Sequence, residues 1–260
     1  MKKKFKIAVC FYGQVRFIET FNMFYKKLND DLDEFEFDFF IGTWNDFDFS
    51  KINLDFKETY LGNEKKVSEN WKEGNTQKMS YLVYKVGQIK KDYEIKNNFH
   101  YDYTLLVRPD VHFPKNEFLK HLNRIKQRTL DRPAVYTAAE LYVDNNMYKI
   151  DEDWMFLFTP EAFDIHYNFY SFFYLSQKWR ELPINYREGG HWIHAYFFKY
   201  NNFIVEKLFS LSTTLIRPKY ELDFYKKHIG ESNFFPKLKQ FRRENKHIVN
   251  NPDFKTKVVC

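Results

Sequence analysis

Strand patterns alternate with amphipathic helix patterns along most of the chain, and this alternation limits the folds that the chain can adopt. Apolar runs of strand length occupy residues 5–13, 35–46, 104–113, 133–140 and 153–160. Between them, apolar residues recur at helical spacing over residues 19–32 and 77–96, around residues 115–128, and from Pro160 onward. Strands that alternate with helices form a mainly parallel sheet covered on both faces. The predicted fold class is therefore α/β, a single domain with a mostly parallel central sheet and helices on both faces.

The rest of the chain shows weaker patterns and an uneven charge. Residues 47–76 follow neither period, residues 189–201 have helical spacing, and residues 203–218 contain one or two late strands. Residues 217–260 hold 11 Lys/Arg and 5 Asp/Glu, whereas the remaining 216 residues hold 30 of each sign, so the whole net charge of +6 lies in this last segment. We predict one domain over residues 1–216 and a basic helical extension over residues 217–260.

The basic extension has two interpretations. It is either a solvated surface helix or a contact with an anionic surface or ligand, such as a membrane with acidic lipids or the phosphates of a bound molecule. Nucleic acid is not the expected partner, because neither a zinc pattern nor an RNP-like aromatic motif accompanies the extension.

Cysteine usage and hydropathy indicate the compartment. Cys10 lies inside an apolar strand and Cys260 is the last residue, which predicts neither a disulfide framework nor a metal cluster. The apolar run near the start is broken at Lys6 and after Tyr12, so it is too short for a signal peptide. No stretch approaches the roughly 18 apolar residues of a membrane span. We therefore expect a cytoplasmic, soluble protein, with the tail as a peripheral contact to anionic membrane.

Polar residues follow four successive strands at the point where each strand ends. In open α/β sheets the ligand lies beyond the carboxyl ends of the strands, so we expect these residues along one rim. They are Tyr12-Gly13-Gln14-Val15-Arg16, Thr43-Trp44-Asn45-Asp46, Arg108-Pro109-Asp110-Val111-His112 and Glu140.

The first of these clusters has the chemistry of an oxyanion site. Gly13 permits a tight turn after the strand, and Arg16 follows near the start of a helix. A guanidinium and helix N–H groups both favour phosphate. The alternative for Arg16 is a surface salt bridge. The chain has neither G-x-G-x-x-G nor G-x-x-x-x-G-K-[ST], which disfavours a dinucleotide site and a P-loop.

Asp110 and His112 are a candidate metal pair. In extended backbone, residues two apart point the same way and lie about 6–7 Å apart. A carboxylate and an imidazole so placed suit an octahedral divalent ion such as Mn²⁺ or Mg²⁺ whose other positions are taken by diphosphate oxygens and water. The alternative is a capping aspartate beside an incidental histidine. His191 and His194 share another helical face, where aromatic neighbours favour core packing over metal binding.

The order of these segments resembles that of GT-A-type glycosyltransferases, in particular a group found in bacterial surface-polysaccharide clusters and large viruses. The resemblance covers residues 5–218. It is carried by "AVCFYGQVR" (8–16), "IGTWND" (41–46), "YDYTLLVRPDVHF" (101–113), "DWMFLFTPEAFDIHY" (153–167), Glu188 and Ile216-Arg217-Pro218.

The resemblance implies a GT-A-like domain that binds a nucleotide-sugar donor, UDP- or GDP-linked, in its N-terminal half. Arg108 to His112 stand where those enzymes carry an Asp-X-Asp metal motif, with His112 in place of the second aspartate, so the implied cofactor is Mn²⁺ or Mg²⁺ on Asp110 and His112. The residues that would border the donor are Tyr12, Gly13, Gln14, Arg16, Thr43, Trp44, Asp46 and Arg108.

The implied reaction is displacement at the anomeric carbon, with transfer of the sugar to a glycan, glycolipid or glycoprotein acceptor in polysaccharide biosynthesis. An inverting enzyme needs a carboxylate that accepts the acceptor's proton. Asp153 is the first candidate for this base and Glu188 the second, and each has a structural role as its alternative. The rival function is a non-catalytic nucleotide- or anion-binding module of the same fold.

Overall fold

The computed structural model describes most of the chain, with gaps. The residues described are 4–15, 18–28, 34–45, 48–64, 74–126, 128–138, 141–144, 147–150, 154–176, 178–181, 190–208, 214–215, 223–224, 227–228 and 234–245.

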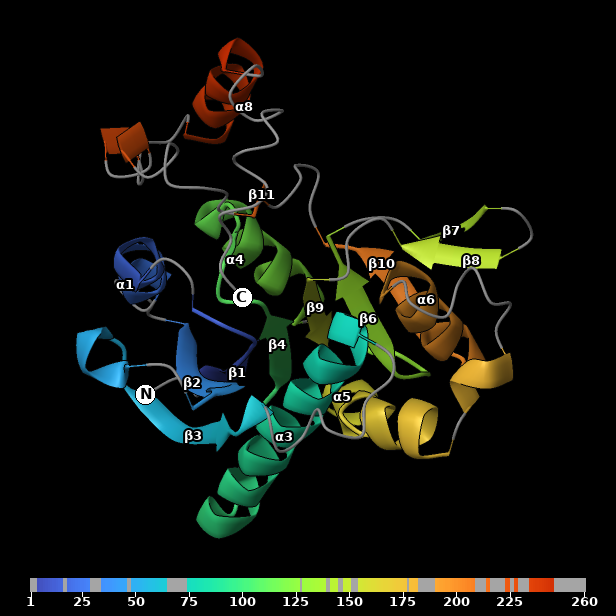
Figure 1. Cartoon of the computed structure of the whole chain (residues 1–260). Coiled ribbons are helices and arrows are strands. Elements are labelled where there is room, and N and C mark those ends of the chain that lie inside the picture. The colour runs from blue at the N-terminus through green and yellow to red at the C-terminus, as the bar shows by residue number, and fades with distance from the viewer. Residues whose placement is uncertain are drawn as a thin grey trace.

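Strands and helices alternate over much of the chain (Figure 1). The strands are β1 (Phe5–Tyr12), β2 (Phe35–Trp44), β3 (Phe56–Gly62), β4 (Tyr103–Val107), β5 (Val111–His112), β6 (Ala134–Thr137), β7 (Leu141–Asp144), β8 (Met147–Ile150), β9 (Met155–Phe158), β10 (Ile204–Lys207) and β11 (Thr214–Leu215). The α-helices are α1 (Ile18–Leu28), α3 (Gly74–Asn97), α4 (Lys115–Ile125), α5 (Pro160–His166), α6 (Gly190–Tyr200) and α8 (Phe234–Glu244), with the short helices η1 (Phe49–Lys51), η2 (Ser171–Leu175) and η3 (Lys178–Glu181).

Seven strands form the central sheet in the order β10-β6-β9-β4-β1-β2-β3. All of its strands run in one direction except β9, which is antiparallel to both of its neighbours. The first strand lies inside the sheet: the chain adds β2 and β3 on one side of β1 and then returns to place β4 on the other side. This confirms the predicted α/β fold with a mostly parallel central sheet.

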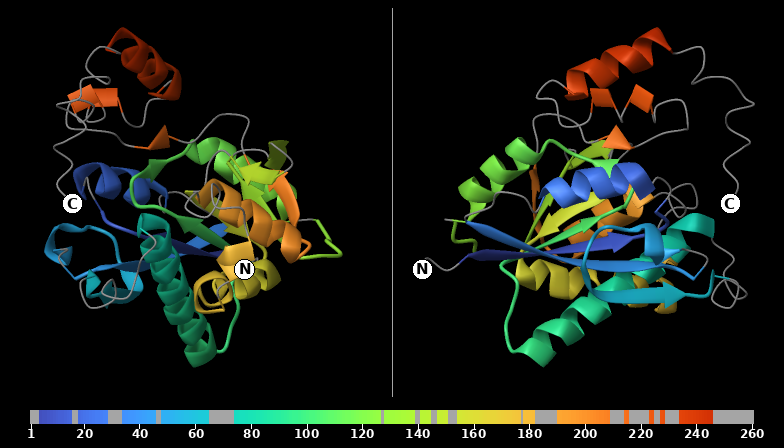
Figure 2. Two further views of the ribbon diagram at one scale, coloured as in Figure 1. Left: turned by 45° about the vertical axis from the view of Figure 1, so that its right-hand side comes forward. Right: turned by 90° about the vertical axis from the view of Figure 1, so that its left-hand side faces the viewer.

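Helices cover both faces of the sheet (Figure 2). The helices α1 and α4 pack on one face, over a core that includes Ile7, Val9 and Phe11 of β1. The helices α3, α5 and α6 pack on the other face, over the alternate residues Ala8 and Cys10. Successive residues of a strand point to opposite faces, so β1 serves both layers and is buried throughout its apolar part.

The long helix α3 approaches the sheet closely at Gly42 of β2. A Cβ atom at this position would lie 3.0 Å from the carbonyl oxygen of Leu82 and 3.3 Å from the Cβ atom of Val86. Any larger residue at position 42 would push the helix outward. The glycine that ends the apolar run of the second strand thus lets α3 rest against the ends of β1 and β2.

Several strands differ from the expectation. The edge strand β3 lies within residues 47–76, where the sequence showed no clear pattern. The apolar signal is weak there because β3 pairs on one side only and its side chains alternate between half-buried and exposed. The hairpin β7–β8 was not predicted either, and β5 pairs in antiparallel fashion with β11, outside the central sheet. Pairing with segments distant in the sequence specifies β3 and β5, whereas β7 and β8 pair with each other across a short connection.

The basic extension is described mainly at α8. Leu238 is almost fully buried, and the ring of Phe241 lies 4.5 Å from that of Phe224. The apolar side of α8 is therefore already in contact with protein, while Lys239 and Arg243 are exposed. Within the described residues, no helix combines the length and the apolar character that crossing a membrane requires.

Candidate active site

The ends of β1 and β4 meet at the centre of the sheet. The two strands are parallel neighbours, with Phe11 opposite Val107, and β2 pairs with β1 on its other side. The direction in which the chain adds strands changes between β1 and β4. A crevice forms at such a switch point because the connections leave the two strand ends in opposite directions, and ligands of open α/β sheets bind there.

Gly13 makes the turn that leaves β1. Its backbone φ is +106°, a conformation that side chains with a Cβ atom rarely adopt, and a Cβ atom there would lie 3.1 Å from Cε of Met79 on α3. Its N–H donates to the carbonyl of Gly42 at 3.1 Å. Glycine is required for the turn, as the sequence predicted, and a Cβ atom there would also crowd the flexible end of the Met79 side chain. Gln14, the next residue, is half-buried.

The side chains of Tyr12, Thr43 and Trp44 lie inside the fold. Thr43 is fully buried, and only 4% of Tyr12 and of Trp44 is exposed. The Trp44 ring is parallel to that of Tyr81 of α3 at 6.3 Å, and a Cβ atom at Gly62 would lie 2.9 Å from Trp44. These side chains therefore pack beneath the rim, and their predicted contact with a donor stays a prediction.

A hydrogen-bonded turn follows β4. The N–H of Val111 donates to the carbonyl of Arg108 at 3.1 Å, which makes Arg108-Pro109-Asp110-Val111 a four-residue turn. Proline suits the second position of such a turn because its ring fixes φ near −65°. The N–H of Arg108 donates to the carbonyl of Trp154 at 3.0 Å, so the residue before β9 lies beside the turn.

Arg108 and Asp110 form a two-pronged ion pair within this turn. Nε donates to Oδ1 at 3.0 Å and Nη2 donates to Oδ2 at 2.7 Å. Only 6% of the Asp110 side chain is exposed, against 25% for that of Arg108. The carboxylate is thus drawn into the protein, and the guanidinium lies nearer the solvent.

His112 lies on β5 and is fully buried. Its ring stacks on that of Phe24 of α1, with centroids 4.4 Å apart and planes 12° apart. Burial lowers the pKa of His112 from 6.5 to about 3, so the imidazole is neutral at physiological pH. The backbone of His112 pairs with Thr214 of β11, which brings the segment before the basic extension next to this turn.

The donor types of Asp110 and His112 suit a divalent ion. A neutral imidazole and a carboxylate are both common ligands, and each carboxylate oxygen can accept more than the one hydrogen bond from Arg108. The positive guanidinium opposes a second cation, so an ion would share Asp110 with Arg108. In the described part of the chain, no group of three or more His, Cys, Asp or Glu residues could hold a metal. Further ligands would have to come from the bound donor or from the rest of the chain.

Four predicted site residues lie outside the described residues: Arg16, Asp46, Asp153 and Glu188. Glu140, at the fourth strand end, does too. The structure therefore brings together Gly13, Gln14, Arg108 and Asp110 around the ends of β1 and β4, with His112 behind them.

Tyr25 of α1 belongs to this cluster and was not recognised as a site residue from the sequence. Its hydroxyl donates to the carbonyl of Val111 at 2.8 Å. Burial, and then the charge of Asp110, raise the pKa of Tyr25 well above its usual value. The helical spacing of Phe21, Phe24, Tyr25 and Leu28 indicated only a face that packs in the core. The sequence signal that could have identified Tyr25 was its hydroxyl, because a buried tyrosine hydroxyl needs a hydrogen-bond partner.

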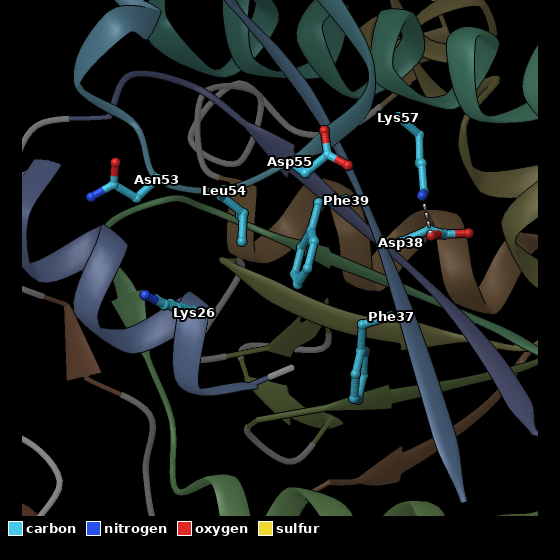
Figure 3. Close-up of a pocket in the computed structure, with 8 residues that line it drawn as sticks. All are labelled: Lys26, Phe37, Asp38, Phe39, Asn53, Leu54, Asp55 and Lys57. Carbon is cyan, nitrogen blue, oxygen red and sulfur yellow. Dashed lines mark ion pairs between the residues drawn. The ribbon is translucent and has the colours of Figure 1, made fainter. Parts of the chain in front are cut away.

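A separate hollow of about 230 Å³ lies between α1, the middle of β2 and the start of β3 (Figure 3). Its floor is apolar, and two lysines and two aspartates surround it, of which Lys57 and Asp38 pair at 3.3 Å. None of the predicted site residues lines it. The residues around the hollow are Lys26, Phe37, Asp38, Phe39, Asn53, Leu54, Asp55 and Lys57.

No protein-family profile and no curated protein matches the chain in sequence. Among solved structures, one similar chain is 4-diphosphocytidyl-2C-methyl-D-erythritol synthase from Anaerococcus prevotii, at 12% identity and a TM-score of 0.46, over 87% of this chain and 98% of that one. Another is a glycosyltransferase involved in glycosylation of the major capsid protein of PBCV-1, at 10% identity and a TM-score of 0.45, over 86% and 99%. A third is a Drosophila galactosyltransferase 7 in complex with manganese and UDP-Gal, at 13% identity and a TM-score of 0.41, over 84% and 73%.

Proposed function

We propose that the chain is a glycosyltransferase that moves a sugar from a nucleotide-diphosphate donor to a glycan, glycolipid or glycoprotein acceptor. The observation that carries this proposal is the meeting of the Gly13 turn with the Arg108–Asp110 pair at the switch point between β1 and β4. A tight glycine turn beside the charged turn Arg108–Val111, at neighbouring strand ends, suits a phosphorylated ligand. The sequence segments that resemble GT-A-type enzymes include both turns.

In this proposal the donor diphosphate lies between the two turns. Gln14 and Arg16 border the nucleotide from the β1 side, with Asp46 near the ribose and base. Tyr12, Thr43 and Trp44 support the strand ends from below, because their side chains are buried. Arg108 faces the crevice from the other side and neutralises charge that develops on the leaving diphosphate.

A divalent ion, Mn²⁺ or Mg²⁺, would be held by Asp110 with His112 as second ligand. When bound, it would neutralise the leaving diphosphate as a Lewis acid. The pairing of Asp110 with Arg108 supports an alternative in which the arginines alone do so. Measuring nucleotide binding with and without EDTA distinguishes neutralisation by a metal from neutralisation by the arginines.

Asp153 is our first candidate for the base that accepts the acceptor's proton, and Glu188 is the second. Asp153 directly precedes Trp154, whose carbonyl accepts the N–H of Arg108. The residue that follows Asp153 is therefore hydrogen-bonded to the Arg108–Val111 turn, which supports Asp153 as the first candidate for the base. The base is needed only if the enzyme inverts the anomeric configuration.

A thermal-shift panel tests the proposal. The full chain is heated with UDP, GDP and their sugar conjugates, each with MnCl₂ or with EDTA. A nucleotide present at about a hundred times its Kd stabilises the fold by about 2.7 kcal/mol, which raises Tm by roughly 5–10 °C. Selective stabilisation by one base, followed by release of sugar from its conjugate, supports the transferase. Stabilisation without turnover favours a non-catalytic nucleotide-binding module. No shift with any nucleotide contradicts the transferase and favours a module that binds another anion.

A further inference from the structure

Helix α1 contacts the charged turn through two adjacent aromatic residues. Tyr25 is fully buried, and its hydroxyl donates to the carbonyl of Val111, 86 residues away in the chain, at 2.8 Å. Val111 directly follows Asp110. The hydrogen bond therefore attaches the last residue of the Arg108–Val111 turn to the helix that follows Gly13.

Phe24 makes the second contact. Its ring stacks on His112 at 4.4 Å and meets Phe113 edge-on at 5.0 Å. Tyr25 itself is edge-on to both of these residues, at 6.5 and 6.4 Å. The three residues after Asp110 are thus held by neighbouring side chains of one helix turn.

The Tyr25 hydroxyl is the directional part of this contact. Stacked rings resist separation but slide at little cost, whereas a buried hydrogen bond fixes both the distance and the direction of the carbonyl that it binds. Without this donor, the Val111 carbonyl would be buried without its hydrogen bond from Tyr25. The turn would then shift until the carbonyl found another donor.

We propose that Tyr25 is a positioning residue of the donor site: its hydroxyl sets the height of the Arg108–Val111 turn above β4 and so places Asp110 and Arg108 against the donor diphosphate. The inference rests on the proposed function. Tyr25 is buried and does not itself reach a ligand; it acts through the carbonyl of Val111. Because α1 also follows Gly13 and Gln14 in the chain, one helix adjoins both strand ends.

Tyr25→Phe tests this, since it removes the hydroxyl and keeps the ring. Tyr103→Phe is the matched control: the Tyr103 hydroxyl also donates to a buried carbonyl, that of Ile125 at 3.3 Å, but from the first residue of β4 rather than from beside its end. Two quantities are measured on each full-length variant: amide hydrogen exchange of the peptide over residues 108–113, and the Kd of UDP and GDP with MnCl₂.

We expect Tyr25→Phe to speed exchange of that peptide and to weaken nucleotide binding, each by about tenfold, because a buried carbonyl loses its donor. Tyr103→Phe should leave both unchanged while lowering Tm. Unchanged exchange in Tyr25→Phe overturns the positioning role whatever the protein binds. Faster exchange with unchanged Kd also overturns it, and leaves the proposed function intact. If the wild-type chain binds neither nucleotide, the proposed function fails, and the positioning of a donor fails with it, even where exchange quickens.

Discussion

Arg108 holds Asp110 by two nearly parallel hydrogen bonds, of 3.0 and 2.7 Å, inside a single four-residue turn. The pair is internally neutral and lies beyond β4, beside the end of β1. Paired charges within one turn suit a site that must remain ordered without its ligand and still offer charge to a ligand that arrives.

Asp110→Ala should abolish Mn²⁺-dependent nucleotide binding. It should also lower the free energy of unfolding by about 1–2 kcal/mol, because Arg108 loses its ion-pair partner. This cost is larger than that of a solvent-exposed ion pair, since the Asp110 side chain is nearly buried. Calorimetric titration with MnCl₂ and with EDTA measures the first effect, and urea denaturation the second. Binding that survives both EDTA and Asp110→Ala would show that arginines alone neutralise the diphosphate.

Asp153→Asn should lower turnover by far more than it weakens donor binding, because a base acts only in the transition state. Steady-state kinetics alongside nucleotide titration separates the two effects. Glu188→Gln is the parallel variant. If Asp153→Asn loses stability but keeps its activity per folded molecule, Asp153 has a structural role and Glu188 becomes the candidate.

Gly13→Ala should destabilise the fold by about 1–3 kcal/mol, since the backbone φ of +106° is strained for any residue with a Cβ atom. Chemical denaturation measures this. The double variant with Met79→Ala removes the contact at 3.1 Å but leaves the strain. We expect it to recover little stability. Full recovery would assign the cost to crowding by α3 instead.

Stability should fall as the pH drops below about 6.5. Burial lowers the pKa of His121 to about 4 and that of His166 well below its usual value, with the neighbouring Arg124 and His194 as the second causes. Between the unfolded value of 6.5 and these lowered values, the unfolded chain binds protons that the folded chain does not. Each such histidine then lowers the free energy of unfolding by up to about 1.4 kcal/mol per pH unit.

His166→Phe should make this pH dependence shallower. His166 is fully buried among aromatic rings and lies 3.3 Å from His194, Nε2 to Nδ1, so phenylalanine can take its place in the cluster. Urea denaturation at pH 7.5, 6.0 and 5.0 gives the slope for each protein. An unchanged slope in His166→Phe would mean that other groups dominate the acid response.

The basic extension should bind acidic liposomes weakly and through charge alone, because the apolar side of α8 already packs on Phe224. Lys239→Glu with Arg243→Glu should weaken co-sedimentation by at least tenfold, at about 1 kcal/mol for each charge lost. The control is the same change of charge elsewhere, Lys96→Glu with Lys120→Glu. Binding should fall with salt. Equal binding to neutral liposomes, or none to acidic ones, contradicts a membrane role.

Elements with a local cause could be predicted from the amino-acid sequence alone. The continuous apolar run of β1 predicts a strand buried on both faces. The spacing of aromatic residues in α1 predicts a helix and its buried face, because the period of the backbone decides which side chains share a face. Gly13 predicts a turn and Pro109 suits one. The polar rim followed from these elements and from the general rule for parallel sheets.

Which distant groups meet could be learned only from the folded chain. Nothing near Asp110 in sequence indicates that Tyr25 binds the next carbonyl, that Phe24 stacks on His112, or that β11 pairs with β5. Nor does the local pattern show that Trp44 lies in the core or that β3 forms the sheet edge. Local periodicity fixes directions along a segment; the partner of each side chain depends on how whole helix and sheet faces pack, which is a property of the assembled layers.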